Sequence, residues 1–412
     1  MAYLVSVLDP SQRASEPSGP DVVVGVPAEP DRVAASGAAQ AVQSALATVF
    51  PERAALALVL TDDPAGAAPP DDVAPTRDAP PPMVYTGGHV GPEAALPTLL
   101  EIAVAREAPA CALLEPLPRP TDPSWLRSLF DPILASGFDL VAPAYTRRRL
   151  EGVLVTGIVY PLTRALFGQR LRQPLGREIV VSRRLAQHLL RDAEWHADPS
   201  HAGADLWVIT KALAHEVKLA QVFLGPRPVP QAQPPSVPDA LASVVGKLFL
   251  EMERYAPYWQ RIRGSLPVPT FGDERSATET APAPSPGSLV EAFALGWRDL
   301  RPLWSTLLPP QTLLALQRIP REPAESFRMP DHLWARIVYD FAVGWRFKAM
   351  DRLQLLRSMT ALYLGWVASF VNEVAPLDAT ASDTRIERLC AAFEAEKSYL
   401  IARWRWPDRF NP

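Results

Sequence analysis

The sequence is poor in cysteine and in long apolar runs. Its two cysteines, Cys111 and Cys390, lie far apart and outside any C-x-x-C pair, which excludes a disulfide framework and favours a reduced, cytoplasmic protein. The longest lipid-like run, 362–371, is half of what a membrane-spanning helix needs, so we predict no transmembrane segment. The opening MAYLVSVLDP also lacks the basic region of a signal peptide.

The chain carries no excess of basic charge. Its formal net charge of −4 gives no footprint for nucleic acid, so we expect no nucleic-acid partner. A G-x-S-x-G motif, an intact P-loop and a dinucleotide fingerprint are absent, which leaves hydrolase chemistry with little support. Proline is abundant instead, at 46 residues, and its clusters at 64–82, 116–123, 226–238 and 266–286 indicate irregular loops.

The first half of the chain alternates between two apolar patterns. Short β-branched or apolar runs predict buried strands, and apolar positions at helical spacing predict the helices between them. Such alternation is typical of an α/β layer with a mostly parallel sheet. The predicted strands are 21–26, 54–60, 110–114, 138–142 and 219–224, and the predicted helices are 31–49, 93–107, 125–135, 185–191 and 205–216.

The second half changes character and shows little strand pattern. We therefore predict an α/β domain over 1–232 and an all-helical domain over 233–412, with a mobile linker at 264–287. Most of the tryptophans fall in the helical part, where we expect them to fill the core. The predicted helices are 238–263, 287–305, 310–317, 331–348, 351–374 and 383–405.

Several segments resemble one enzyme family. VAPAYTRRRLEG, RQPLGREIVVSRR, AGADLWV and, further on, LYLGWVASFV are similar to GT-A nucleotide-sugar glycosyltransferases, in particular bacterial relatives of mannosylglycerate synthase and glucosyl-3-phosphoglycerate synthase. The resemblance implies a GT-A, Rossmann-like domain followed by a helical domain. It also implies a nucleotide-sugar ligand, whose hexose the active relatives transfer to a small anionic acceptor.

On the donor side the resemblance is incomplete. In VVVGVPAEPD, Pro27 and Glu29 partly match the family's Pro-x-x-Asn opening, and in LVLTDDPAGAA, Asp62 stands where an acid contacts the base. Asp62 is equally well explained as an acidic loop residue with no role in binding. In VGPEA, Pro92 takes the place of a lysine and Glu93 adds negative charge where a diphosphate would lie, which is electrostatically unfavourable.

The loop RQPLGREIV resembles the family's Gln-Pro-x-Gly-Gly loop, which presents its backbone to the donor sugar. Gln173 and Gly176 match it, and Arg177 replaces the second glycine. Arg177 supplies positive charge in place of a metal or, alternatively, fills space that glycine leaves for the ligand.

The family's metal site is depleted. In CALLEPLPRPTDPSW, Glu115 takes the place of the first acid of Asp-x-Asp and Leu117 that of the second, and Val229 stands near the expected histidine. We therefore predict no metal cofactor, with Mg²⁺ or Mn²⁺ bound only if Glu115 still holds an ion. Asp122 is an alternative ligand or a helix cap, and the histidines of 195–201 match no strong metal motif.

On the acceptor side, Arg147, Arg148 and Arg149 either bind an anionic acceptor or form a solvated basic turn, with Thr156 on the helix that follows. Asp205 matches an acid that lies near the reacting sugar in the family, or else it caps its own helix.

Two functions follow from these losses. The favoured one is a degenerate, non-catalytic transferase that binds or scaffolds, docking a second copy or an active homologue. The alternative is an active, metal-independent hexosyltransferase in which Arg177 and the turn 147–149 stabilise charge and Asp205 orients a hydroxyl. The sequence leaves open whether the protein is an enzyme.

Overall fold

The computed structural model describes part of the chain, and that part forms two compact units. The sheet unit comprises Met1–Thr146, Leu175–Gln231 and Val268–Arg275, and the helical unit comprises Arg147–Pro174, Ala232–Pro267 and Ser276–Pro412. The units are interleaved along the chain, whereas the sequence predicts consecutive domains divided at 232/233. The described residues are 21–28, 32–61, 83–86, 95–116, 122–146, 148–175, 178–192, 204–215, 217–226, 236–272 and 284–406.

The sheet unit is built on one eight-stranded sheet in the order β10-β8-β5-β7-β4-β1-β2-β3. Only β7 runs antiparallel to its neighbours, β4 and β5, so the predicted mostly parallel sheet is confirmed. The strands are β1 (Val22–Pro27), β2 (Ala55–Thr61), β3 (Met83–Thr86), β4 (Ala110–Leu113), β5 (Leu140–Thr146), β7 (Ile179–Ser182), β8 (Leu219–Pro226) and β10 (Thr270–Phe271).

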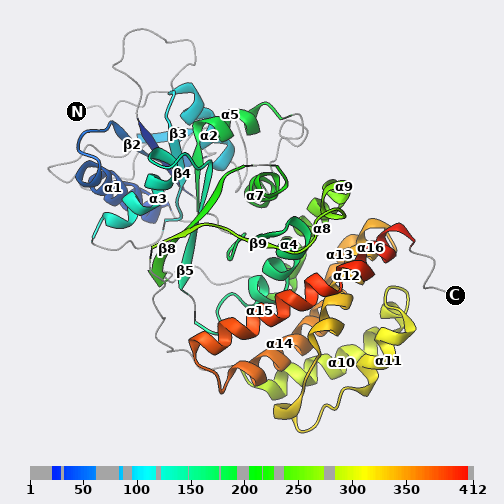
Figure 1. Cartoon of the computed structure of the whole chain (residues 1–412). Coiled ribbons are helices and arrows are strands. Elements are labelled where there is room, and N and C mark those ends of the chain that lie inside the picture. Colours follow the sequence, from blue (N-terminus) through cyan, green and yellow to red (C-terminus); the bar gives the residue numbers. More distant parts are fainter. Residues whose placement is uncertain are drawn as a thin grey trace. The chain divides into compact units, whose positions relative to one another are not determined.

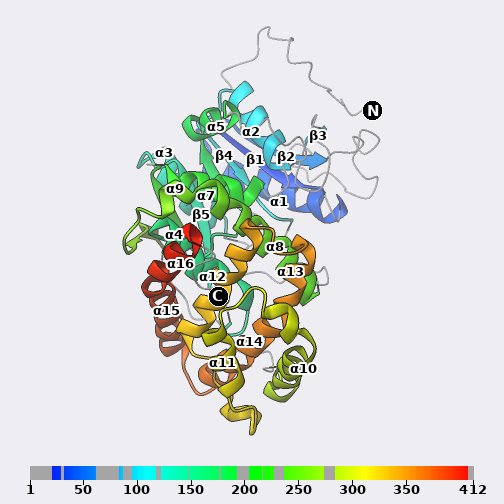
Figure 2. The ribbon, with the colours of Figure 1, turned by 90° about the vertical axis from the view of Figure 1, so that its right-hand side faces the viewer.

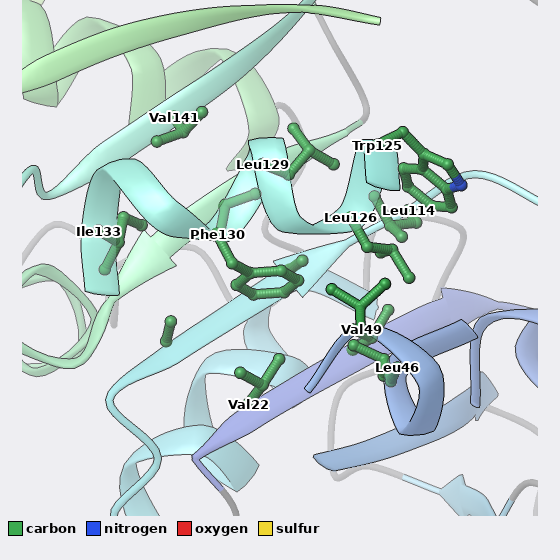
Figure 3. Close-up of a cluster of buried hydrophobic side chains, with 14 of the residues drawn as sticks. Val22, Leu46, Val49, Leu114, Trp125, Leu126, Leu129, Phe130, Ile133 and Val141 are labelled. Carbon is green, nitrogen blue, oxygen red and sulfur yellow. The ribbon is translucent and has the colours of Figure 1, made fainter. Parts of the chain in front are cut away.

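Helices cover both faces of this sheet, as buried parallel strands require. On one face α1 (Arg32–Val49) and α3 (Ser124–Leu134) pack on the strands, and Figure 3 shows Leu46, Val49, Leu126 and Phe130 in one cluster with Val22. Three residues further along β1, Gly25 faces the opposite side of the sheet. A Cβ atom added there would lie 3.2 Å from the side chain of Leu99 in α2. The other helices are α2 (Ala95–Ala105), α5 (Arg183–Leu190) and α7 (Ala204–Ala214).

The helical unit is almost entirely α-helical (Figures 1 and 2), so the predicted helical character of the C-terminal part is confirmed. It includes the π-helix η2 (Val155–Val159), the 3₁₀ turn η3 (Ala324–Ser326) and the short strand pair β6 (Gln169–Arg170) and β9 (Leu266–Pro267). Its α-helices are α4 (Tyr160–Phe167), α8 (Val237–Arg254), α9 (Ala256–Trp259), α10 (Pro286–Trp304), α11 (Pro310–Arg318), α12 (Asp331–Arg346), α13 (Arg352–Ser358), α14 (Thr360–Val374), α15 (Ala379–Ala395) and α16 (Lys397–Arg405).

Tryptophans fill the core of the helical unit, as expected. Trp334 and Trp366 are fully buried, and their rings stack with centroids 5.6 Å apart. The indole Nε1 of Trp334 donates to the carbonyl oxygen of Gly157, 2.8 Å away. A Cβ atom on Gly157 would lie 2.1 Å from the ring of Trp366, so the π-helix approaches the indole at a distance that only glycine permits.

The structure differs from the sequence predictions at specific places. Strand β7 lies in the loop RQPLGREIVVS, and the predicted helices 238–263, 351–374 and 383–405 are each divided in two. Within the predicted linker 264–287, the short strands β9 and β10 form; their residues are exposed, and Val268 between them is buried. In the described ranges we find no helix with the length and apolar character needed to cross a membrane.

Candidate functional site at the carboxyl edge of the sheet

The carboxyl ends of the parallel strands define one edge of the sheet, where α/β proteins bind ligands. Pro27 ends β1 at this edge, and Glu115 follows the end of β4. Because β7 runs antiparallel, its first residue pairs with the last residue of β4, Leu113 with Ile179. The residue before β7, Glu178, is thereby brought to the same edge as Glu115.

Glu178 is a buried carboxylate fixed between two strands. Its side chain is 4% exposed, and its Oε1 accepts a hydrogen bond from the backbone N–H of Glu115 at 3.2 Å. Its Oε2 accepts a hydrogen bond from the hydroxyl of Tyr145, near the end of β5. The carboxylate thus joins the ends of β4 and β5 across the start of β7, and both of its oxygens are used.

Glu115 is the described residue that would anchor a metal ion at this edge. Within the described residues no group of three or more histidine, cysteine, aspartate or glutamate side chains could hold an ion. Asp122 accepts hydrogen bonds from the backbone N–H of Ser124 at 3.0 Å and from its hydroxyl at 2.7 Å. The bonds from Ser124 lower the pKa of Asp122. The N-cap position of α3 is Pro123, so Asp122 binds the turn that leads into the helix and does not occupy the cap position itself.

Asp205 lies in the first turn of α7, not before it. Its Oδ1 atom is buried and has no hydrogen-bond partner in the part of the chain that the structure describes. The free N–H groups of the first turn therefore do not use this oxygen, which disfavours the interpretation of Asp205 as a helix cap. A buried acceptor without a donor is costly, so an unpaired oxygen here needs a physical reason.

The acceptor-side candidates Arg148, Arg149 and Thr156, together with Gln173 from the donor loop, belong to the helical unit. There Arg149 Nη1 donates to the carbonyl oxygens of Val374 and Ala375, both at 3.1 Å, and of Leu377 at 2.6 Å. A cation at a helix C-terminus satisfies its free carbonyl groups and its dipole. Arg149 is therefore engaged by the end of α14, and Thr156 lies in the π-helix η2.

The remaining predicted site residues lie outside the described residues. They are Glu29, Asp62, Arg147, Gly176 and Arg177, with Pro92, Glu93, Leu117 and Val229 among the positions compared with the family.

The pair formed by Tyr145 and Glu178 is the feature that the sequence does not reveal. The available signal is a charged residue directly before the β-branched run Ile179–Val181, which is the start of a buried strand. A hydrogen bond between residues 33 positions apart leaves no local pattern.

No protein-family model matches the chain, and no curated protein does either. Among solved structures, the chain is similar to glucosyl-3-phosphoglycerate synthase from Mycobacterium tuberculosis in complex with Mn²⁺, UDP-glucose and phosphoglyceric acid. The two are 15% identical, the match covers 58% of this chain and 80% of that chain, and the TM-score is 0.39.

A second complex of that synthase, with Mn²⁺, UDP and glucosyl-3-phosphoglycerate, is 18% identical over 57% of this chain and 80% of that one, with a TM-score of 0.38. A mycobacterial protein is 20% identical to this chain. That match covers 57% of this chain and 75% of that chain, and its TM-score is 0.39. Because these scores are low, the assignment of donor, acceptor and metal rests on the residues of this chain.

Proposed function

We propose that this protein is a glycosyltransferase-like protein that binds or scaffolds without catalysing transfer. The observation that carries the proposal is the carboxylate of Glu178, held at the carboxyl edge by the backbone of Glu115 and the hydroxyl of Tyr145. In the family that the sequence resembles, this edge receives the diphosphate of the donor.

The electrostatics of the edge oppose a diphosphate. Two like unit charges 4 Å apart repel by about 1 kcal/mol in water and by about 4 kcal/mol at the effective dielectric of a protein surface. A divalent ion would reverse that balance, but the described residues at the edge supply no ligand cluster. The carboxylates of Glu115 and Glu178 would therefore weaken diphosphate binding.

On this proposal, the protein retains the glycosyltransferase-like fold in order to bind a partner, and not for catalysis. The partner would be a second copy or an active homologue, a nucleotide-sugar would bind weakly or not at all, and the setting would be the cytoplasm of a bacterium. These assignments extend the resemblance of the sequence, and they belong to the proposal.

One observation favours the alternative, an active and metal-independent hexosyltransferase. The unpartnered Oδ1 of Asp205 is a buried acceptor available to a ligand hydroxyl. If it orients a sugar or an acceptor, the positive charge for the leaving diphosphate would come from Arg177, which replaces the second glycine of the donor loop.

A ligand-dependent melting experiment separates the two proposals. A ligand that binds only the folded state raises the melting temperature by mass action. We expect UDP-, GDP- and ADP-sugars at millimolar concentration to leave the melting temperature unchanged, with and without Mn²⁺. A clear rise with one nucleotide-sugar, together with hydrolysis or transfer of its sugar, would overturn the binding-only proposal in favour of the active one.

A further inference from the structure

Two arginines, one on α10 and one from a later segment, lie over the same indole ring of α10. Phe293, Trp297 and Arg301 follow one another at intervals of four and so share a face of the helix. Phe293 is fully buried, Trp297 is half-buried and Arg301 is exposed. From the segment after α11, Arg321 joins this face (α10 and α11 are labelled in Figure 2).

Both guanidinium groups lie over aromatic rings. The Cζ of Arg321 is 5.6 Å from the ring centroid of Phe293 and 5.7 Å from that of Trp297. The Cζ of Arg301 is 5.4 Å from the same Trp297 centroid. Each contact stabilises the cation by attraction to the ring face, and together they hold two positive charges on one indole.

The hydrogen-bonding edge of Arg321 is unpaired. Its Nε and Nη2 atoms are buried and have no hydrogen-bond partner among the residues that the structure describes. The Nε–H bond and one Nη2–H bond point in parallel toward the same edge of the planar guanidinium group. That pair binds a carboxylate or a phosphate in a bidentate manner, and leaving buried charged donors unpaired costs more than leaving neutral ones unpaired.

The neighbouring charges do not neutralise these arginines. In the described segments no salt bridge joins a carboxylate to Arg301 or to Arg321. By contrast, Arg298 on the same helix pairs with Asp299, at 2.7 Å between Nε and Oδ1. Arg301 and Arg321 therefore have no ion-paired carboxylate in the described part of the chain.

We propose that Arg321, Arg301 and Trp297 form a binding site for a small oxyanion, a carboxylate or a phosphate group. The Nε and Nη2 atoms of Arg321 donate two parallel hydrogen bonds to the anion, Arg301 adds a second charge, and the rings hold both arginines in place.

Titration calorimetry of the full chain with sodium phosphate and with sodium acetate, at ionic strength held constant with chloride, tests this site. Arg321→Lys keeps the charge and removes the fork, so we expect about a tenfold or greater loss of affinity, since each tenfold is about 1.4 kcal/mol. Arg301→Gln is expected to weaken binding less. The matched control is Arg298→Gln, whose side chain is already paired, and it should leave the affinity unchanged.

The relative affinity of phosphate and acetate identifies the class of ligand.

Saturable binding that Arg321→Lys abolishes and Arg298→Gln preserves would support the site. If Arg321→Lys does not fold, as circular dichroism would show, a weaker affinity in Arg301→Gln supports the site and an unchanged one overturns it. No saturable binding to the wild type, or equal binding to all variants, would also overturn the proposal, whatever the nucleotide-sugar experiment shows.

Discussion

The hydroxyl of Tyr145 donates a hydrogen bond to the buried carboxylate of Glu178, and so joins the end of β5 to the start of β7. The same carboxylate accepts from the backbone of Glu115 after β4. One side chain therefore ties three adjacent strands together at the edge where a ligand would bind. We expect this contact to stabilise the sheet, and on the proposed function its negative charge opposes an anion.

The first prediction concerns this contact. Tyr145→Phe removes a hydrogen-bond donor from a buried carboxylate, so we expect the free energy of unfolding to fall by about 1–3 kcal/mol. In a double-mutant cycle with Glu178→Gln, urea unfolding should give a coupling energy of about 0.5–3 kcal/mol. A coupling energy near zero would show that the hydrogen bond contributes nothing to stability.

The second prediction concerns Gly157, whose added Cβ would lie 2.1 Å from the ring of Trp366. We expect Gly157→Ala to lower the free energy of unfolding by about 1–3 kcal/mol or more, because the aromatic core has to move. The matched control is Gly37→Ala in α1, where nothing lies within 4 Å of the added atom. It should be neutral or stabilising by about 0.5–1 kcal/mol. Equal melting temperatures for the two variants would contradict this account of the core.

The third prediction concerns the pH dependence of stability. Asp340 is fully buried and accepts hydrogen bonds from the hydroxyl of Tyr399 at 2.8 Å and from Nε of Arg403 at 3.0 Å. Burial raises the pKa of Asp340 to about 7. The folded chain then holds this proton more tightly than the unfolded chain does, so stability is lost as the pH rises toward 7.

Asp340→Asn mimics the protonated side chain and removes this titration. The difference in the free energy of unfolding, wild type minus variant, should therefore fall as the pH rises from about 4 to about 7, by at most about 1.4 kcal/mol per pH unit. Urea unfolding of both proteins at pH 5, 6 and 7 measures it. A difference that grows with pH would mean that pairing with Arg403, and not burial, sets the pKa.

The fourth prediction separates two arginines of the basic turn. Arg149 caps the end of α14 through three carbonyl groups, so Arg149→Ala should destabilise the protein by about 1–2 kcal/mol. Arg148→Ala is the matched control, and as a substitution outside such a contact it should change stability by no more than about 0.5 kcal/mol. Thermal unfolding of the two variants gives the comparison, and equal stabilities would return Arg149 to the acceptor-binding interpretation.

Periodicity predicts much of this fold, because it depends on local spacing. The apolar runs at Val22–Val26 and Ala55–Leu60 form adjacent parallel strands, and helical spacing locates α10 and α12. Strand β7 is missed because the resemblance assigns RQPLGREIVVS to a loop, although Ile179–Val181 is β-branched. Its antiparallel direction, which places Glu178 at the edge, follows only from its pairing with β4 and β5.

The candidate site is harder to predict, for a physical reason. The partners of a side chain are set by packing between distant segments: Arg149 reaches carbonyl groups more than 220 positions away. Some helix boundaries are also hard to predict, because the breaks carry no proline or glycine. Pro257 marks the start of α9, but the division between α15 and α16 at Glu396 has no such residue to signal it.

The most direct test of the central claim compares UDP with uridine, which share a base and a ribose but differ in the diphosphate. If the carboxylate of Glu178 opposes the diphosphate, calorimetry should show that UDP binds the wild type no more tightly than uridine does. Glu178→Gln should then improve the affinity for UDP by about tenfold or more, a change of about 1.4 kcal/mol, without changing that for uridine. Tyr145→Phe, which keeps the charge, serves as the control. Tight binding of UDP to the wild type, unchanged or weakened in Glu178→Gln, would contradict the account.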